Sequence, residues 1–182
     1  MLAAARTDGQ PQIVAPAIAA AAQLQLARGN QEEARAILAE LDQQPGVRGE
    51  PTYASRLPCL VRSALGLRDQ ELAARLVDGV EPLVPVSDHA LTSCRAELAE
   101  ATGNRAEAAR IYADAAHRWQ QFGNVPERAH ALLGQGRCLH ALGDPTAEAP
   151  LAEARELFAS MGYRPALAET DALLAGSQPA AS

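Results

Sequence analysis

The sequence predicts an all-α protein built from about four antiparallel helix pairs and a final capping helix. A turn followed by a helix rich in small residues occurs four times, with the turns at Gly29, Arg68, Gly103 and Gly143. These turns are 39, 35 and 40 residues apart, a period typical of stacked helix pairs. Hydrophobic residues make up 48% of the chain but aromatic residues only 3%, so the predicted core is mainly alanine and leucine. Alanine favours helices and lets their axes approach closely, which supports the all-α class.

The first predicted pair spans residues 13–42, with Gly29 in its tight turn. Asn30 is the expected N-cap of the second helix, and its first turn is acidic, where the helix dipole favours negative charge. Residues 43–51 contain prolines and glycines and are therefore read as a linker. The second predicted pair spans residues 52–80.

The third predicted pair, residues 88–121, has the most regular pattern. The fourth spans residues 126–160, with Pro126 and Pro145 at the starts of its helices, where the first backbone donors have no intrahelical partner. Residues 165–175 are then expected to form a single helix whose apolar face covers the end of the array.

One helical repeat domain is expected over residues 13–175. Residues 1–12 are interpreted as the remnant of a preceding repeat or a loose N-terminus, and residues 176–182 as a disordered tail.

Composition and charge exclude several classes of function. The net charge is −6 and no basic stripe stands out, so we expect no direct nucleic-acid contact from this segment. No apolar run approaches the roughly 20 residues needed to span a bilayer, so no membrane partner is expected. Cys59, Cys94 and Cys138 lack CxxC spacing, which favours reduced thiols in a cytoplasmic protein.

Set on a frame of 34 residues, the pairs resemble tetratricopeptide repeats. That family places alanine early in the second helix, a large residue four positions later and a small residue three after that. The third pair matches with Ala108, Tyr112 and Ala115. The fourth matches with Ala147, Leu151 and Ala154. The first has Ala34 and Leu38 but then Leu41, the second matches only loosely, and the tryptophan expected early in each first helix is absent. The resemblance implies a solenoid in which small residues let paired helices touch.

Residues 126–175 also resemble the C-terminal repeats of large bacterial signalling ATPases, linked to adenylate or guanylate cyclase domains or to LuxR-type regulators. In those proteins the repeats are a sensory and docking arm. This chain has no GxxxxGK[ST] phosphate loop. The resemblance therefore implies a non-catalytic interaction scaffold whose partner is a protein, a peptide or another domain of its parent chain. The alternative is a stand-alone adaptor that binds a linear peptide or helix.

Residues typical of catalysis or metal binding are not grouped in the sequence. The four histidines form no HExxH motif, and Cys138 and His140 are two apart, on different faces of a helix. Glu97 and Glu100 share a helical face with the spacing of an acid pair, but solvated carboxylates explain them better than catalysis. We therefore expect no enzymatic activity, no catalytic or metal-binding residues and no cofactor.

A groove is the sharper hypothesis for a binding site. In tetratricopeptide folds, fixed positions of the first helices line a concave surface. Carried over to this sequence, those positions are Arg62, Glu97, Glu100, His130, Arg137 and His140, with Cys59 and Cys94 at equivalent sites. The resulting groove has mixed charge and departs from the lysine- and asparagine-rich clamp that captures C-terminal peptides. It is expected to bind a peptide or helix, or to pack against other domains of the parent chain.

Overall fold

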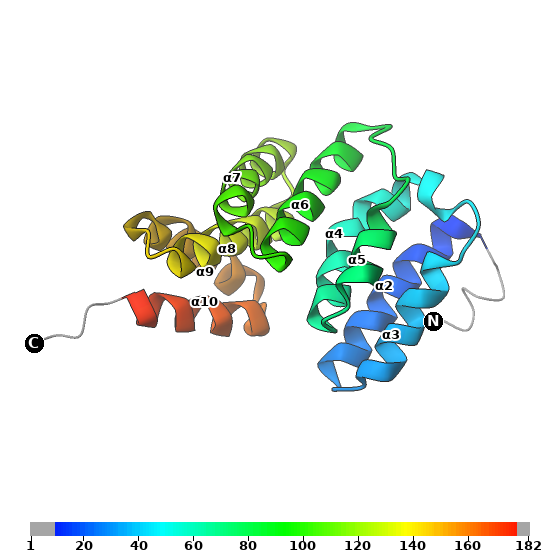
Figure 1. Cartoon of the computed structure of the whole chain (residues 1–182), viewed down its shortest axis with the longest axis horizontal. Coiled ribbons are helices and arrows are strands. Elements are labelled where there is room, and N and C mark those ends of the chain that lie inside the picture. The colour runs from blue at the N-terminus through cyan, green and yellow to red at the C-terminus, as the bar shows by residue number, and fades with distance from the viewer. Residues whose placement is uncertain (1–9, 178–182) are drawn as a thin grey trace, which may run out of the picture. The chain divides into compact units, whose positions relative to one another are not determined.

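The computed structural model describes residues 10–177, and all regular secondary structure in that range is helical (Figure 1). The chain divides into two compact units, residues 1–94 and 95–182, with the division inside helix α6 (Pro85–Ala101). The all-α class predicted from the sequence is therefore confirmed for the described residues. Of the two end segments predicted from the sequence, 1–12 and 176–182, residues 1–9 and 178–182 lie outside the described residues.

Unit 1 contains two helix pairs and the first part of α6. The first pair is α2 (Pro11–Ala27) with α3 (Gln31–Asp42), and the second is α4 (Pro51–Gly66) with α5 (Gln70–Val77). A 3-10 turn, η1 (Val47–Gly49), lies in the linker between them. Helix α2 therefore begins two residues before the predicted pair, and α5 ends three residues before the predicted boundary.

Unit 2 contains the end of α6 and four further helices. These are α7 (Arg105–Phe122), α8 (Val125–Ala141), α9 (Glu148–Met161) and α10 (Arg164–Ser177). The fourth pair departs from the prediction at one point, because Pro145 starts a 3-10 turn, η2 (Pro145–Ala147), and α9 follows it. Helix α10 corresponds to the helix predicted over residues 165–175, but it continues through Gly176 and Ser177, which belong to the segment predicted as a tail.

The repeated turns share an unusual backbone conformation. Gly29, Gly103 and Gly143 have φ of 80°, 84° and 70°, the left-handed region that glycine enters without a steric penalty. Arg68 occupies the same place in the second pair with φ of 59°, the one described residue other than glycine with positive φ. Its Cβ crowds the following carbonyl, so this turn is strained.

Polar contacts join the helices of unit 1 both within the second pair and between the two pairs. The hydroxyl of buried Tyr53 on α4 donates to the carbonyl of Leu76 on α5 at 2.6 Å. Asp42, at the end of α3, accepts from Arg48 in η1 at 2.6 Å and from Arg75 on α5 at 2.9 Å. The two carboxylate oxygens of Asp42 therefore connect α3, the second helix of the first pair, both to the linker and to α5, the second helix of the second pair.

The helices of unit 2 pack closely because small residues face large ones. A Cβ built on Gly134 of α8 would lie 2.4 Å from Cζ of Tyr112 on α7. A Cβ on Gly136 would lie 2.4 Å from Cγ of Leu151 on α9. These two glycines bring α8 against the helices before and after it, which explains the Gly-Gln-Gly segment in the middle of an apolar helix.

We expect Arg68→Gly to stabilise unit 1. The change relieves the left-handed strain at an exposed turn, and the added unfolded-state entropy of glycine offsets part of the gain, so the net increase should be about 1 kcal/mol. Urea unfolding measures it. Gly29→Arg places the opposite change at the equivalent turn and should lower the midpoint; if both variants shift the same way, the strain assignment is wrong.

We expect Gly134→Ala to destabilise unit 2 by about 1–3 kcal/mol, because the new methyl group overlaps the ring of Tyr112. The result runs against helix propensity, which favours alanine by about 1 kcal/mol. Gly66→Ala is the matched control, since a Cβ on Gly66 meets no atom within 4 Å. Thermal unfolding of the two variants should therefore shift in opposite directions; a stabilised Gly134→Ala would contradict the packing described.

Candidate functional site

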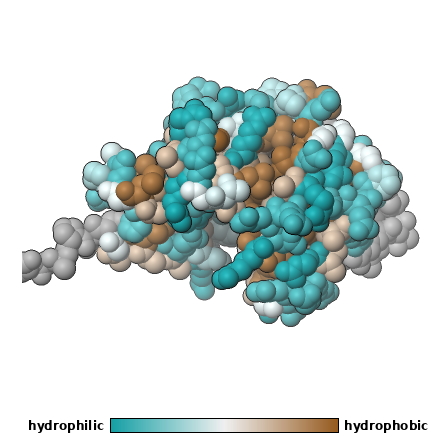
Figure 2. Space-filling view, in the orientation of Figure 1, coloured by the Kyte–Doolittle hydropathy of each residue, from teal (hydrophilic) through white to brown (hydrophobic). Residues whose placement is uncertain are grey.

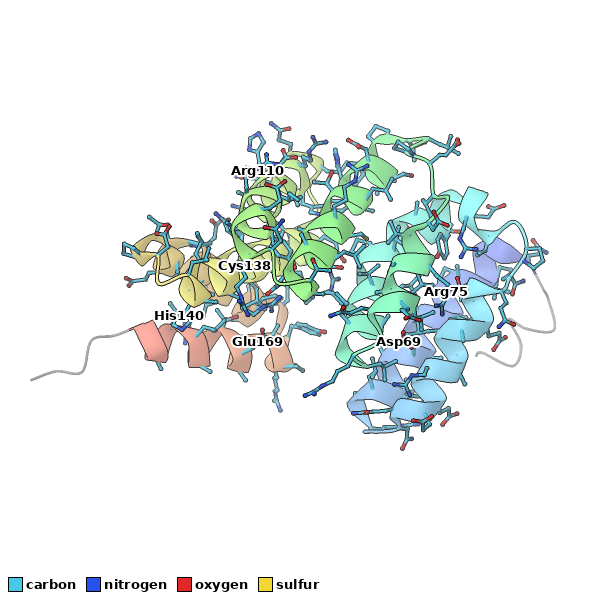
Figure 3. All side chains as sticks on the ribbon, viewed as in Figure 1. Asp69, Arg75, Arg110, Cys138, His140 and Glu169 are labelled. Carbon is cyan, nitrogen blue, oxygen red and sulfur yellow. The ribbon has the colours of Figure 1, made fainter. Side chains whose placement is uncertain are left out.

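A line of three charged side chains crosses three helices of unit 2, and we refer to Glu100, Arg137 and Glu169 as the charged ladder. Arg137 on α8 donates from Nε and Nη2 to the two carboxylate oxygens of Glu100 on α6, at 2.5 and 2.7 Å. Its Nη1 donates to Oε1 of Glu169 on α10 at 2.7 Å. Figure 3 labels Glu169 together with Cys138, the neighbour of Arg137 in sequence. The charges of the ladder thus alternate in sign. Arg137 is 37 residues from Glu100 and 32 residues from Glu169 in the chain.

The ladder grades from a buried end to an exposed end. The side chain of Glu100 is 18% exposed, that of Arg137 37% and that of Glu169 46%. Burial opposes ionisation of Glu100, but the hydrogen bonds and charge of Arg137, with the Tyr112 hydroxyl donating at 2.8 Å, outweigh it. The pKa of Glu100 therefore lies below its ordinary value, and the carboxylate is ionised at neutral pH.

The groups around the ladder hold fixed protonation states. Burial opposes the charge of Arg137, but the bonds to Glu100 outweigh burial and raise its pKa further. Burial, with the nearby carboxylates, raises the pKa of the Tyr112 hydroxyl. Burial also raises the pKa of the Cys138 thiol to about 12, so the reactive thiolate is scarce near neutrality. This arrangement offers charged and hydrogen-bonding groups for binding.

The two histidines of α8 lie in different surroundings. The His130 ring packs edge-on against Phe158 at 5.1 Å and Tyr163 at 5.6 Å between ring centroids. Phe158 is buried, whereas Tyr163, in the turn between α9 and α10, is 41% exposed. His140 lies beside α10, where its Cε1 would be 3.6 Å from a Cβ on Gly176.

The structure brings together part of the predicted groove. Glu100 and Arg137 form the ion pair of the charged ladder, and His130 and His140 share α8 with Arg137. Glu97 is buried on α6, only 5% exposed. The remaining predicted residues belong to unit 1. They are Cys59 and Arg62 on α4, both half-buried, and the buried Cys94 on α6.

Sequence reasoning missed two members of the site, Glu169 and the hydroxyl of Tyr112. The sequence predicts Glu169 to lie in the capping helix, which contributes no position to the predicted groove. Its distance of 32 residues from Arg137, beside the 37 between Arg137 and Glu100, is close to the repeat period and would have indicated it. Tyr112 was identified as the large packing residue of its repeat, and a tyrosine at such a position brings a hydroxyl that needs a partner.

Within residues 10–177 no group of three or more histidine, cysteine, aspartate or glutamate side chains is arranged to hold a metal ion. In the same part of the chain, no helix has both the length and the apolar character needed to cross a membrane.

The comparisons with known proteins add no family: no protein-family model matches the chain, and a search of curated proteins finds no match.

We expect Arg137→Leu to destabilise unit 2 by about 2 kcal/mol at pH 7, because it leaves the half-buried Glu100 carboxylate without its cation. In the native protein the lowered pKa of Glu100 adds stability above its unfolded pKa, about 4.3, which is lost as pH falls through the folded value. In the Arg137→Leu variant, burial favours the protonated form of Glu100. The stability difference between the two proteins should therefore shrink between pH 7 and pH 3.

Arg110→Leu is the control for this measurement. Arg110 pairs with Glu107 on the exposed surface of α7, at 2.6 Å, and solvent screens that interaction. Urea unfolding at several pH values should show little change for this variant. A pH-independent loss in Arg137→Leu would mean that lost packing, and not the charge of Glu100, sets its stability.

Proposed function

We propose that this chain is a non-catalytic scaffold for protein–protein interaction, working in the bacterial cytoplasm as the C-terminal sensory and docking arm of a multidomain signalling or transcriptional regulator. The observation that carries the proposal is the charged ladder of unit 2, whose outer end, Arg137 and Glu169, is half open to solvent. A surface that alternates in sign over three helices selects a partner by charge pattern.

The ladder has unused capacity for hydrogen bonding. A guanidinium group has five N–H donors, and the contacts of Arg137 with Glu100 and Glu169 use three. The others can bind carbonyl oxygens or a carboxylate of a partner segment, while Glu169 can accept from a partner's basic side chain. A peptide or helix with an acidic and a basic residue side by side fits this pattern.

The protonation states around the ladder support binding over catalysis. Ion pairing favours the charged forms of Glu100 and Arg137, and the pKa values of the neighbouring Tyr112 hydroxyl and Cys138 thiol are both raised. Catalytic acids and bases usually have pKa values near the working pH, whereas the pKa values of these four groups are shifted away from it.

The docking arm is favoured over a stand-alone adaptor by the resemblance of residues 126–175 to the C-terminal repeats of signalling ATPases. The docking arm and the stand-alone adaptor predict cellular proteins of different size. An antibody against unit 2 should detect a large polypeptide with an ATPase or cyclase segment in the first case, and a protein of about the mass of this chain, 19.1 kDa, in the second.

The binding proposal is tested by a photo-crosslinking amino acid at Ala172, exposed on α10 and three residues from Glu169, so on the same helical face. Position Glu156, exposed on α9, is the comparison site. A discrete protein should be captured in cells from position 172 and not from 156.

Glu169→Lys should then weaken binding of that protein roughly tenfold, because it reverses the charge at the open end of the ladder. It leaves the Glu100–Arg137 pair in place, so circular dichroism should be unchanged. Glu156→Lys is the matched control and should bind normally. Equal capture from both positions, or equal affinity of both charge variants, would overturn the proposal.

A further inference from the structure

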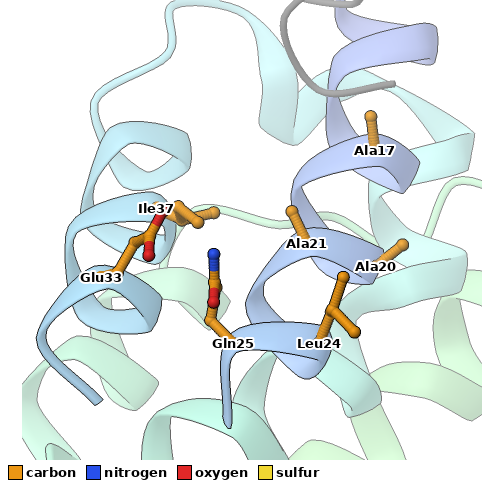
Figure 4. A pocket seen from close by; sticks show the side chains of 7 residues that line it. All are labelled: Ala17, Ala20, Ala21, Leu24, Gln25, Glu33 and Ile37. Carbon is orange, nitrogen blue, oxygen red and sulfur yellow. The ribbon is translucent and has the colours of Figure 1, made fainter. Parts of the chain in front are cut away.

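The outer side of the first helix pair carries an open apolar pocket of about 410 Å³ (Figure 4). We refer to its lining as the α2–α3 face. The lining comprises Ala17, Ala20, Ala21, Leu24 and Gln25 of α2 and Glu33 and Ile37 of α3. Helix α2 has no charged residue between Pro11 and Ala27, so all its sides are apolar or neutral. Such a helix is normally surrounded by other helices.

One large apolar side chain of this face is open to solvent. Leu24 is 49% exposed, and Ile13, on the same helix but outside the face, is 42% exposed. The space-filling view shows how much of the visible surface is hydrophilic, with hydrophobic side chains in smaller patches (Figure 2). Contiguous apolar surface on a folded chain marks a place where another molecule binds.

The internal repeat shows what covers such a face. Adding 39 to each residue number of the first pair gives the equivalent residue of the second pair, so that Gly29 aligns with Arg68 at the turn. Five of the seven lining positions then fall on buried residues: Leu60, Ser63, Ala64, Leu72 and Leu76. On the first pair only Ala17 and Ile37 are buried. The difference arises because α2 and α3 pack against α4 and α5, and so cover the equivalent face of the second pair.

Helix α3 covers its neighbour with an arginine and a leucine three residues apart. Leu38 is fully buried. Arg35 reaches across to the carboxylate of Asp69, at 3.5 Å, and donates to the carbonyl of Leu67 at 3.2 Å. The equivalent positions on the first pair are Asn30 and the carbonyl of residue 28. Glu33, in the first turn of α3, carries the one charge among the seven lining residues and is therefore the acidic group that such an arginine could pair with.

Unit 2 shows which side chain the face can hold. There Tyr112, the equivalent of Leu38, fills the space above Gly134. The residue equivalent to Gly134 on the first pair is Ala20, whose methyl group occupies that space. A tyrosine would therefore clash, and a leucine or a smaller aliphatic residue fits.

We propose that the α2–α3 face binds an α-helix of a partner protein that presents Arg-x-x-Leu, with the leucine over Ala20 and the arginine against Glu33. A second copy of this chain joined through the same face fits less well, because the lining residues include no basic side chain to pair with Glu33. The inference goes beyond the proposed function, since the charged ladder lies in unit 2 and this face in unit 1.

The probe is a synthetic peptide of residues Gln31–Asp42, the segment that covers the equivalent face of the second pair. A hydrocarbon staple joins positions 32 and 36, both exposed in α3, so that helix formation does not limit binding. The peptide carries Glu33→Gln to remove like-charge repulsion. Fluorescence anisotropy with the full chain should give a dissociation constant on the order of 100 µM.

Variants of the full chain locate the binding. Leu24→Asp and Glu33→Arg should each weaken it at least tenfold, whereas the matched controls Leu83→Asp and Glu81→Arg, in the exposed loop before α6, should leave it unchanged. A peptide with Arg35→Glu should bind poorly to the native chain and recover binding to the Glu33→Arg variant.

Absence of binding by a peptide that circular dichroism shows to be helical would overturn the proposal, as would equal losses in the control variants. Two further outcomes would also overturn it by naming another occupant. One is a dimer in sedimentation that Leu24→Asp dissolves. The other is peptide binding that occurs only after residues 1–9 are deleted. None of these outcomes bears on the charged ladder, whose test uses positions 156, 169 and 172.

Discussion

Close approach of helices through small residues is the constraint on which this structure depends. The chain has few aromatic residues, so its core is filled by alanine and glycine on one helix facing a single large side chain on the next. Tyr112 over Gly134 and Leu151 against Gly136 show the arrangement directly. Because a methyl group at either glycine would overlap its neighbour, the spacing of α7, α8 and α9 is set by residues that lack a side chain. The alanine-rich composition is thus the means by which the pairs stack.

Ion pairs form a second level of organisation on this packing. In each unit they join equivalent elements of successive pairs: Asp42 and Arg35 link α3 with α5, and Arg137 links α8 with α6 and α10. Charged residues on repeated helices meet at intervals near the repeat period, so the same geometry that stacks helices also aligns charges. In unit 2 the outer end of this alignment, Arg137 and Glu169, is half open to solvent.

The two proposed binding surfaces follow from different consequences of repetition. The charged ladder arises where successive first helices present side chains to one another. The α2–α3 face arises where a surface that is covered in the second pair remains open in the first. At this face the exposed Glu33 stands where the second pair has the buried Leu72.

The sequence by itself determined the helical class, the turns and the helix boundaries to within a few residues, because these depend on local propensities and on a period that a single chain displays. The resemblance to tetratricopeptide repeats also named Glu100 and Arg137 together, as residues of one predicted groove. Only the tertiary structure decided that these two are bonded to each other and to Glu169, that Glu97 is buried, and that two compact units meet within α6. The reason is physical: burial and ion pairing depend on how far each helix is rotated against its neighbour. That rotation is set by side-chain volumes in contact across the core, such as the ring of Tyr112 over Gly134, which no local pattern specifies.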